Sequence, residues 1–410
     1  MTKYLFILGR KQLISIAELI AVLPTDTQYL HFQYDQLLIE TNEIEDPQAF
    51  LNKLGGTIKI VKINQEIKGN EANVIKALAD QAAEKFTGRT DKVRYAYFVK
   101  TLKQRPEIFL KKALAEAKKK LKSLELSSRF INNNFQNAPI ALLKGEGIMK
   151  KGTEFAAIEI PGQWMIGETV AIQDIDAYSE RDYERPERDA RLGMLPPKLA
   201  QVMINLSGAK SGVIYDPFCG IGTVMMEANL MGYDAVGSDV SREALAKAES
   251  NLHWIHKKAE LTQTFRLFQA DATSLSHGHL PEEIAAVVSE TYLGPPKKQT
   301  PEPEKIEMTF IEIEDMLGNF LSAIGQLIKP GTPIVITLLT YRNTHHMGPK
   351  FYSMDRFIDE IEDFGFHTES LIDEDIAADL KIKTSEPLDR LLYEREDQVA
   401  CRTIVKLVKD

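Results

Sequence analysis

The stretch that decides the fold is Val213-Ile214-Tyr215-Asp216-Pro217-Phe218-Cys219-Gly220-Ile221-Gly222-Thr223, which leads into the apolar run Val224–Met231. A short apolar strand ends at an acidic residue, two glycines follow, and the next residues predict a helix. Glycines let the backbone turn tightly and approach a ligand, and a helix start presents free N–H groups. The pattern indicates a ligand-binding loop between a strand and a helix of an α/β fold.

This loop does not suit a dinucleotide phosphate. A phosphate-binding loop has the spacing G-x-G-x-x-G, whereas Gly220 and Gly222 are followed by Thr223, Val224 and Met225. Asp216 would repel a pyrophosphate, and it suits a cationic ligand such as the amino and sulfonium groups of S-adenosylmethionine. The loop therefore predicts a methyl-donor site. A generic doubly wound domain that binds another nucleotide is the alternative.

Two further carboxylates follow at the ends of predicted strands. The strand Tyr233–Val240 contains Asp239, 23 residues after Asp216, in the region where nucleotide-binding α/β units place a carboxylate for ribose hydroxyls. A third strand, Thr264–Ala270, ends at Asp271, whose carboxylate is expected to accept a hydrogen bond from an adenine amino group. For Asp271 alone, helix capping is the plainer interpretation.

Length and composition limit the classes of protein to which this chain can belong. A chain of 410 residues suits two or three domains. Its two cysteines, Cys219 and Cys401, favour a reducing compartment over a disulfide framework. No apolar run is long enough to span a bilayer, and Tyr4–Leu8 is too short for a signal peptide. We expect a cytoplasmic protein with no membrane partner.

Charge is distributed unevenly along the chain. The net charge of −9 by itself disfavours a nucleic-acid partner. Residues 101–151, however, hold twelve Lys and Arg against four Asp and Glu, whereas residues 354–398 are strongly acidic. This asymmetry indicates one basic surface on an acidic body. For Lys118–Lys120 alone, a solvated helix face is the plainer interpretation.

The order of predicted elements divides the chain into four parts. Residues 1–68 have a small α+β pattern, and residues 69–172 have a second one that contains a basic helix predicted over Glu107–Leu124. Residues 173–195 are expected to form a linker. Residues 196–410 alternate strands and helices, as a mostly parallel sheet requires. The expected fold class is α/β, with an α+β amino-terminal half.

Three local expectations concern segments without a clear pattern. Ile140–Leu143 is expected to be a short strand. Pro295–Glu304 is a polar Pro/Lys/Glu loop, either a lid beside the site or a disordered insertion, and a helix is expected only from Phe310 onward. His345 and His346 are expected to be loop residues, because adjacent strand residues point to opposite faces and no Cys/His cluster accompanies them. No metal site is expected.

Several segments together resemble the tRNA guanine-10 N2-methyltransferase family, in which a catalytic domain follows an RNA-binding THUMP module. In chain order they are Leu5–Arg10, Tyr178–Pro186, Gly193–Ala200, Met203–Leu206, the loop Asp216–Thr223 and Tyr393–Val399. The resemblance implies a small domain over 1–68, a THUMP-like domain over 69–172 and a Rossmann-like methyltransferase domain over 196–410. It also implies S-adenosylmethionine as cofactor, and a tRNA acceptor end gripped by the basic region 101–151.

The resemblance also implies a site for the target base. The family carries Asp/Asn-Pro-Pro-Tyr/Phe at the end of the fourth strand, whose oxygens orient an exocyclic amine while the aromatic ring stacks on the base. Here Ala285–Ser289 predicts that strand, and Glu290-Thr291-Tyr292-Leu293-Gly294 follows. Glu290 falls where the Asp would be, and Tyr292 would supply the ring, but the double proline is missing. The alternative role for Glu290 is a capping or ion-paired carboxylate.

The expected function is methylation of a guanine N2 amine in tRNA. The loop residues Asp216, Phe218, Gly220, Gly222 and Thr223 would hold the donor with Asp239 and Asp271, and Glu290 and Tyr292 would position the base. The departure at Glu290–Gly294 leaves three outcomes open: a guanine amine as target, a different atom as target, or donor binding without activity.

The sequence also leaves two other functions, one protein partner and two interpretations of the segment 178–198 open. A DNA amino-methyltransferase needs the same target geometry, and a non-catalytic RNA-binding or assembly protein would retain the donor pocket. Some family members require a small activator protein, which is therefore a candidate partner. The segment 178–198 is either a linker pinned by salt bridges or, through Pro196–Leu199, a wall of the donor pocket.

Overall fold

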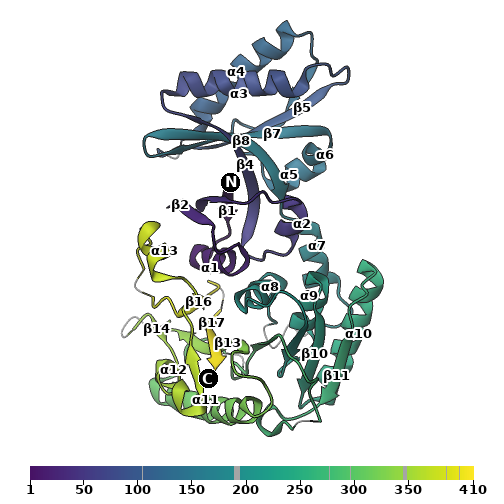
Figure 1. Cartoon of the computed structure of the whole chain (residues 1–410), viewed down its shortest axis with the longest axis vertical. Coiled ribbons are helices and arrows are strands. Elements are labelled where there is room, and N and C mark those ends of the chain that lie inside the picture. Colours follow the sequence, from purple (N-terminus) through teal and green to yellow (C-terminus); the bar gives the residue numbers. More distant parts are fainter. Residues whose placement is uncertain are drawn as a thin grey trace. The chain divides into compact units, whose positions relative to one another are not determined.

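The structure, a computed structural model, forms two compact units (Figure 1). The first comprises Met1–Gly9, Pro24–Asn52 and Thr57–Ile175, and the second comprises Arg10–Leu23, Lys53–Gly56 and Asp176–Asp410. None of the described helices has the length and apolar character needed to cross a bilayer. The structure describes residues 1–103, 105–188, 194–276, 278–295, 297–344, 349–384, 386–396 and 398–410.

The first unit is built on an eight-stranded sheet in the order β2-β3-β1-β4-β8-β7-β5-β6. Its strands are β1 (Thr2–Leu8), β2 (Gln28–Gln33), β3 (Gln36–Thr41), β4 (Thr57–Ile67), β5 (Val93–Lys100), β6 (Ser128–Phe130), β7 (Gly152–Ile160) and β8 (Gln163–Ile172). β5 runs parallel to β6 and β7, and the remaining pairs are antiparallel. Because β4 pairs with both β1 and β8, strands from the two expected amino-terminal parts share one sheet. The boundary at residue 68 remains a prediction.

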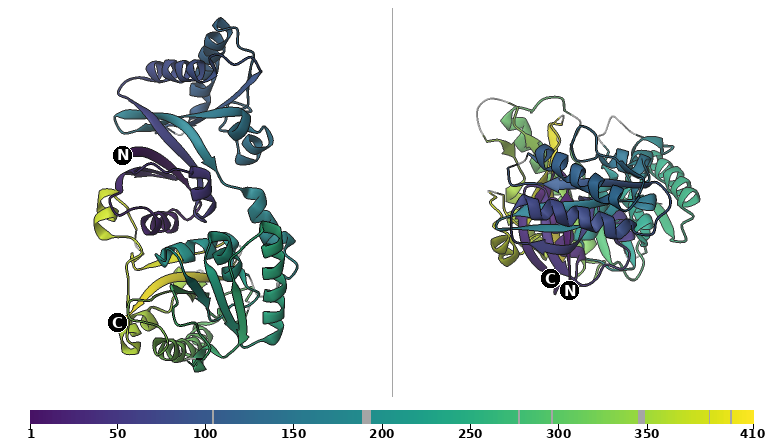
Figure 2. Two further views of the ribbon diagram at one scale, coloured as in Figure 1. Left: turned by 45° about the vertical axis from the view of Figure 1, so that its right-hand side comes forward. Right: turned by 90° about the horizontal axis from the view of Figure 1, so that it is seen from above.

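Helices α3 and α4 lie side by side on one face of this sheet (Figure 1, Figure 2). They bury a stripe that includes Leu78 and Leu110 against Tyr95 and Tyr97 of β5, as the spacing of their apolar residues predicts. Asn70 caps α3, because its side chain accepts the backbone N–H of Asn73. The helices of this unit are α2 (Pro47–Asn52), α3 (Glu71–Phe86), α4 (Pro106–Ser123), α5 (Ile140–Gly145) and α6 (Ile148–Lys151).

The expectation of a strand at Ile140–Leu143 is wrong, because these residues begin helix α5. Pro139 presets the backbone for a helix start, and its carbonyl accepts the N–H groups of Leu142 and Leu143 at 2.9 and 3.1 Å. Leu143 is buried in a small core with Ile148. A four-residue apolar run is too short to distinguish the helical period from the strand period, so the proline is the deciding signal.

The second unit is built on a mixed sheet in the order β11-β10-β9-β12-β13-β17-β15. The first five strands are parallel, and β17 is antiparallel to both β13 and β15. The strands are β9 (Val213–Asp216), β10 (Asp234–Asp239), β11 (Phe265–Gln269), β12 (Ala286–Glu290), β13 (Pro333–Arg342), β15 (Phe366–Thr368) and β17 (Ala400–Lys409), with β14 (Phe351–Tyr352) and β16 (Arg390–Tyr393) pairing at the side. The expected α/β fold with a mostly parallel sheet is confirmed.

Strand order reverses between β9 and β12. From β9 the chain passes outward to β10 and β11, then crosses back to β12 on the other side of β9. In an open α/β sheet, ligands bind outside the carboxyl ends of the strands at such a switch point. The fold therefore places a binding site where Asp216 and Glu290 end their strands.

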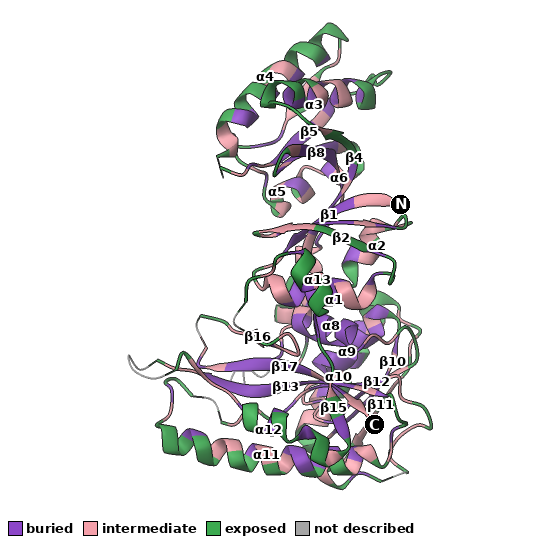
Figure 3. Ribbon diagram, turned by 60° about the vertical axis from the view of Figure 1, so that its left-hand side comes forward, coloured by how far each residue is buried: buried purple, intermediate pink, exposed green. Residues whose placement is uncertain are grey.

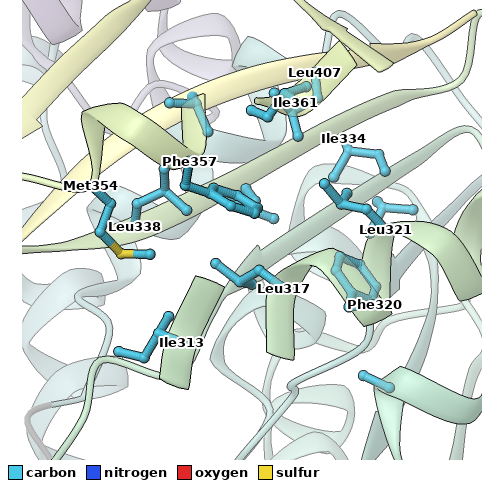
Figure 4. Close-up of a cluster of buried hydrophobic side chains, with 14 of the residues drawn as sticks. Ile313, Leu317, Phe320, Leu321, Ile334, Leu338, Met354, Phe357, Ile361 and Leu407 are labelled. Carbon is cyan, nitrogen blue, oxygen red and sulfur yellow. The ribbon is translucent and has the colours of Figure 1, made fainter. Parts of the chain in front are cut away.

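Helix α11 covers one face of this sheet with an amphipathic stripe. Figure 3 shows β13 and β17 buried, and α11 with a buried side and an exposed side. Figure 4 shows Leu317, Phe320 and Leu321 of α11 packed near Ile334 and Phe357. The helices and short turns of this unit are α1 (Gln12–Val22), α7 (Ile175–Ser179), α8 (Pro197–Leu206), α9 (Thr223–Met231), α10 (Arg242–Ala259), α11 (Pro303–Gly325), α12 (Asp355–Asp359) and α13 (Glu374–Asp379), with a π-helical turn at Glu180–Glu184 and 3-10 turns at Ala272–Ser274 and Ile361–Phe364.

Helix α11 begins at Pro303, seven residues before the predicted start at Phe310. Proline suits the first helical position, and Glu304 in the first turn complements the helix dipole. The polar composition of this first turn suggested a loop.

Helix α1 belongs to the second unit although it comes from the start of the chain. Its buried Glu18 accepts the N–H groups of Gly55 and Gly56, both at 2.8 Å, and the side-chain amide of Asn205 on α8 at 2.8 Å. Burial raises the pKa of Glu18 to about 7. A buried carboxylate with three donors thus joins α1 to α8.

Candidate functional site

The predicted donor loop connects β9 to α9 at the switch point of the sheet. Gly220 and Gly222 have φ of 51° and 85°, in the left-handed region that glycine adopts without strain. A Cβ on Gly222 would lie 3.2 Å from the Cβ of Ala248, so this glycine also permits close packing on α10. A Cβ on Gly220 would have no atom within 4 Å, so the space beside Gly220 is open. The loop thus offers a bare backbone to a ligand.

Asp216 is buried at the start of the loop, with 2 % of its surface exposed. Its Oδ1 accepts the Ser289 hydroxyl at 2.6 Å and the Phe218 N–H at 3.2 Å. Burial raises the pKa of Asp216 to about 7, against the lowering effect of these two hydrogen bonds. Because Ser289 lies on β12, Asp216 connects the donor loop to the strand that carries Glu290.

Asp239 is the last residue of β10 and Asp271 follows β11, as the sequence predicts. Asp239 accepts the Gly220 N–H at 3.0 Å and the Ser241 N–H at 2.8 Å, so it also holds the donor loop in place. Oδ1 of Asp271 accepts hydrogen bonds from the backbone N–H of Thr273 at 2.9 Å and from the Thr273 hydroxyl at 2.7 Å. Asp271 therefore has the helix-capping role, the plainer of the two interpretations of this residue. Their assignments to ribose and adenine remain predictions.

Phe218 and Thr223 face partners on other elements. The Phe218 ring packs edge-to-face on Phe320 of α11, with centroids 5.3 Å apart. Thr223, the first residue of α9, is buried, and its Oγ1 accepts an N–H of Arg185 at 2.9 Å. Both side chains therefore fix the loop within the unit.

The segment before α8 is packed into the unit by buried charges. The Arg181 Nε donates to Oε1 of Glu227 at 2.7 Å, and both side chains are largely buried. The side-chain amide of Asn251 donates to the carbonyls of Glu187 and Ile221 at 3.1 and 3.0 Å. The segment is therefore pinned by a salt bridge and also tied to the donor loop; residues 189–193 lie outside the described residues. Sequence reasoning did not single out Asn251, which has no motif around it.

Glu290 is the last residue of β12 and forms an ion pair with Arg402 of β17. Arg402 is almost entirely buried, and its Nε donates to Oε1 of Glu290. Burial raises the pKa of Glu290, and the neighbouring guanidinium opposes that rise. This geometry agrees with the alternative interpretation, in which Glu290 is an ion-paired carboxylate. Its role toward a base remains a prediction.

Two tyrosines flank the backbone after Glu290. Tyr292 is 53 % exposed, which leaves its ring free to stack on a ligand. Tyr341 of β13 is fully buried, and its hydroxyl has no hydrogen-bond partner among the described residues. A Cβ on Gly294, where φ is 71°, would lie 3.5 Å from that hydroxyl. Sequence reasoning missed Tyr341, whose only signal is its place near the end of a core strand.

Thr300 anchors the Pro/Lys/Glu loop to the end of β13. Its Oγ1 donates to the carbonyl of Arg342 at 2.5 Å and accepts the N–H of Thr344 at 2.9 Å. Pro296 in the loop, and His345 and His346 beyond β13, lie outside the described residues. Within the part of the chain that the structure describes, no group of three or more His, Cys, Asp and Glu side chains is arranged to hold a metal ion.

Comparison with known proteins agrees with this geometry. Residues 185–296 match the family UPF0020, the RMKL-like methyltransferase domain. The match spans the donor loop and the end of β12. This part of the chain is therefore a methyltransferase domain, and its cofactor is S-adenosylmethionine.

Two curated archaeal proteins named tRNA (guanine(10)-N2)-dimethyltransferase are similar to part of the chain. The protein from Methanothermobacter thermautotrophicus is 35 % identical over 136 residues, which are 33 % of this chain and 38 % of that protein. The protein from Methanocaldococcus jannaschii is 29 % identical over 138 residues, which are 33 % of this chain and 39 % of that protein. The chain thus matches less than half the length of these relatives.

The fold as a whole has a counterpart among solved structures. TrmN from Thermus thermophilus superposes with a TM-score of 0.52 and 14 % sequence identity, and the alignment covers all of both chains. At this identity the likeness shows the shared fold.

The residues at the switch point fit S-adenosylmethionine. Carboxylates follow three adjacent parallel strands at Asp216, Asp239 and Asp271, which suits an ammonium group, ribose hydroxyls and an adenine amine. The open space beside Gly220 admits a ligand to the loop backbone. The buried Asp216 side chain, in its ionised form, supplies the negative charge that a cationic ligand requires.

Proposed function

We propose that the protein methylates an exocyclic guanine amine, N2, in tRNA. The observation that carries this proposal is the Ser289–Asp216 hydrogen bond, because it brings the donor loop and the end of β12 together. Methyl transfer needs donor and acceptor at this short range. The names of the archaeal relatives supply the substrate class. The family match over residues 185–296 includes both elements.

The donor side of the site would bind and orient S-adenosylmethionine. Asp216, Phe218, Gly220, Gly222 and Thr223 would hold the methionine part, with Asp239 at the ribose and Asp271 at the adenine. When bound, S-adenosylmethionine supplies an activated methyl group on its sulfonium. The Asp239 carboxylate, which already positions Gly220, would keep the loop in shape while the donor enters.

The acceptor side would present the amine. Oε1 of Glu290 is held by Arg402, so Oε2 is the oxygen proposed to accept an N–H of the base. The guanidinium of Arg402 lowers the pKa of Glu290 and so favours its ionised form, which is the form that accepts an N–H. Tyr292 is exposed and would stack on the base, which must leave its helical stack to reach the site. Catalysis would then rest mainly on orientation.

The amino-terminal unit is proposed to grip the RNA through the basic region 101–151. Lys112 and Lys120 of α4 are paired with Glu71 and Asp80 of α3, at 3.7 and 2.9 Å. Lys118 and Lys119 are exposed and make no ion pair with a described residue, so they are free for phosphates.

The predicted domain boundaries would separate RNA binding from methyl transfer. A small domain over 1–68 and a THUMP-like domain over 69–172 would bind RNA. The linker 173–195 would lead to the methyltransferase domain over 196–410. A small activator protein is a further proposed partner.

A second candidate is a donor-binding RNA-binding protein without turnover. The Glu290–Arg402 ion pair favours this function, because Arg402 occupies one of the two oxygens that would orient the amine. A guanidinium beside the target also disfavours the positive charge that an amine gains on methylation. A DNA amino-methyltransferase has no comparable support.

The deciding experiment is methyl transfer from labelled S-adenosylmethionine to an unmodified tRNA pool, followed by mass spectrometry of the nucleosides. N2-methylguanosine supports the proposal. Another methylated nucleoside retains the enzyme but moves the target atom. Donor binding without product, with and without a cell extract to supply an activator, supports the second candidate. Single-stranded and duplex DNA of matched length serve as controls.

A further inference from the structure

The Pro/Lys/Glu loop carries two lysines close to the proposed acceptor side of the site. Lys297 and Lys298 are exposed, and neither forms an ion pair with a described residue. They follow Tyr292, the exposed ring proposed to stack on the base, by five and six residues. What these two charges can bind depends on how the loop is held.

Both ends of the segment 294–300 are fixed at the end of β13. Gly294 packs against the Tyr341 side chain, because a Cβ added to this glycine would lie 3.5 Å from the Tyr341 hydroxyl. Thr300 is buried, and its Oγ1 donates to the carbonyl of Arg342 at 2.5 Å and accepts the N–H of Thr344 at 2.9 Å. The two lysines between these fixed points therefore stay at the edge of the sheet where β12 ends in Glu290.

The Thr300 anchor also separates the charges of the loop. Lys297 and Lys298 precede it, on the side of the acceptor residues. Glu302 and Glu304 follow it, at the start of α11, where a carboxylate complements the positive end of the helix dipole. The loop is thus basic on the side of Tyr292 and acidic only on the side of the helix.

Positive charge continues beyond the anchor. Arg342 and Lys11 both donate to Glu394, at 2.7 and 3.0 Å, and the exposed Lys350 acts on the same carboxylate. Burial would raise the pKa of Glu394, but these three cations act against it, and the pKa lies below its usual value. Three cations around one carboxylate leave an excess of positive charge. A surface that extends from the loop to this cluster suits a chain of phosphates.

We propose that Lys297 and Lys298, held in place by Thr300, bind the phosphates that flank the target nucleotide of the RNA. The inference rests on the proposed function. A base that leaves its stack to reach Tyr292 brings its own 5′ and 3′ phosphates to the edge of the site. Phosphate contacts fix the register of a nucleic acid without reading its sequence. The loop would therefore position the nucleotide, and the acceptor residues would select it.

The first test removes the two charges in the full chain. K297Q/K298Q is expected to weaken the affinity for unmodified tRNA about tenfold at low salt and to reduce the slope of log affinity against log salt by about 1.4–1.8, the value for two phosphate contacts. Filter binding across a salt series measures both quantities. Affinity for S-adenosylhomocysteine, measured by calorimetry, should stay at the wild-type value, because neither lysine belongs to the donor loop.

The second test releases the loop and keeps its charges. T300A removes the hydroxyl that bonds to Arg342 and Thr344, so the lysines are no longer held beside Tyr292. The kcat/KM for tRNA is expected to fall about threefold to tenfold, since positioning is lost, with a smaller change in the salt slope than K297Q/K298Q causes. T300S retains the hydroxyl and should keep the wild-type kcat/KM. Thermal unfolding of each variant checks that the fold is intact.

K381Q/K383Q is the matched control. Lys381 and Lys383 follow α13 in the same unit, are exposed and form no ion pair with a described residue. The change in net charge is the same as in K297Q/K298Q, so a general effect of charge on tRNA binding would appear in both variants. We expect the control to keep the affinity and the salt slope of the wild type to within about twofold.

Two results overturn the inference. One is a K297Q/K298Q variant whose tRNA affinity and salt slope equal those of the control, which would make the loop lysines solvated surface charges. The other is a wild-type kcat/KM in T300A, which would show that the anchor positions nothing. Failure of the proposed function is distinguishable. A wild type that binds tRNA without forming N2-methylguanosine contradicts that function, while the salt slope still tests the lysines. A wild type that binds no tRNA overturns both.

Discussion

The hydroxyl of Ser289 donates a 2.6 Å hydrogen bond to Oδ1 of Asp216. Ser289 precedes the proposed acceptor Glu290 on β12, and Asp216 begins the donor loop after β9. The two strands are neighbours at the point where strand order reverses, so both residues end at the same edge of the sheet. The proposed donor and acceptor halves of the site thus share a buried hydrogen bond.

Donor affinity is expected to rise with pH through about 7, the pKa of Asp216. The ammonium of the donor favours the ionised carboxylate, so below that pH binding must first remove a proton. Affinity for S-adenosylhomocysteine should fall by at most about tenfold for each pH unit below the pKa. Calorimetry from pH 5.5 to 8.5 measures this dependence.

Two variants check the assignment to Asp216. S289A removes a hydrogen bond that lowers the pKa, so the midpoint should move to higher pH. D216N should bind the donor more weakly and without this pH dependence. A D216N profile that retains the wild-type midpoint would assign the titration to another group.

The Glu290–Arg402 pair should behave as a coupled unit. E290Q removes the carboxylate that pairs with Nε of the buried Arg402 and is expected to lower the free energy of unfolding by about 3 kcal/mol. R402L in the E290Q background should restore part of that loss, because it also removes the buried guanidinium that E290Q leaves beside a neutral amide. Urea unfolding of the wild type, both single variants and the double variant measures the coupling, and additive losses would contradict it.

Removal of the Tyr341 hydroxyl should leave stability unchanged or slightly raised. The hydroxyl is buried and has no partner among the described residues, so Y341F removes a polar atom that forms no hydrogen bond. Y215F is the matched control, since the buried Tyr215 hydroxyl bonds to Ser238 at 2.8 Å and its removal should cost about 1 kcal/mol. Thermal and urea unfolding compare the two; a larger loss for Y341F than for Y215F refutes this reading of Tyr341.

Glu18 should contribute a pH-dependent part of stability. Its folded pKa of about 7 lies above the ordinary glutamate value of 4.5, so the folded state holds a proton that the unfolded state releases. Stability from this group therefore declines as pH rises from about 4.5 to 7. E18Q should remove that slope and cost about 1–3 kcal/mol, because its NH₂ group faces the donors of Gly55, Gly56 or Asn205. Urea unfolding at pH 5 and pH 8 measures both effects.

Charge reversal on α4 should weaken tRNA binding. K118E/K119E replaces two exposed cations with anions and is expected to lower affinity about tenfold or more at low salt and to reduce the salt dependence. K112E/K120E makes the same change in net charge and is the comparison, because these lysines are partly neutralised by Glu71 and Asp80. Filter binding across a salt series measures both; equal effects would argue against a surface centred on Lys118 and Lys119.

Local patterns in the sequence predicted most of the elements near the site. The strand, glycine loop and helix around Gly220 are where the sequence places them, and Asp239 and Asp271 follow their strands. These features depend on turn chemistry and apolar spacing, which neighbouring residues record. The prediction of a strand at Ile140–Leu143 also relied on local spacing, and it failed because four residues are too few to define a period.

The sequence alone determined the α/β class, the donor loop and the order of strands and helices, since each follows from residues close together in the chain. Only the tertiary structure decided which distant side chains meet. Arg402 reaches Glu290 across 112 residues, and Ser289 reaches Asp216 across 73. These contacts depend on sheet order, which places β17 and β12 on either side of β13 and β12 beside β9. Strand order is a property of the whole packed sheet, so no local pattern contains it.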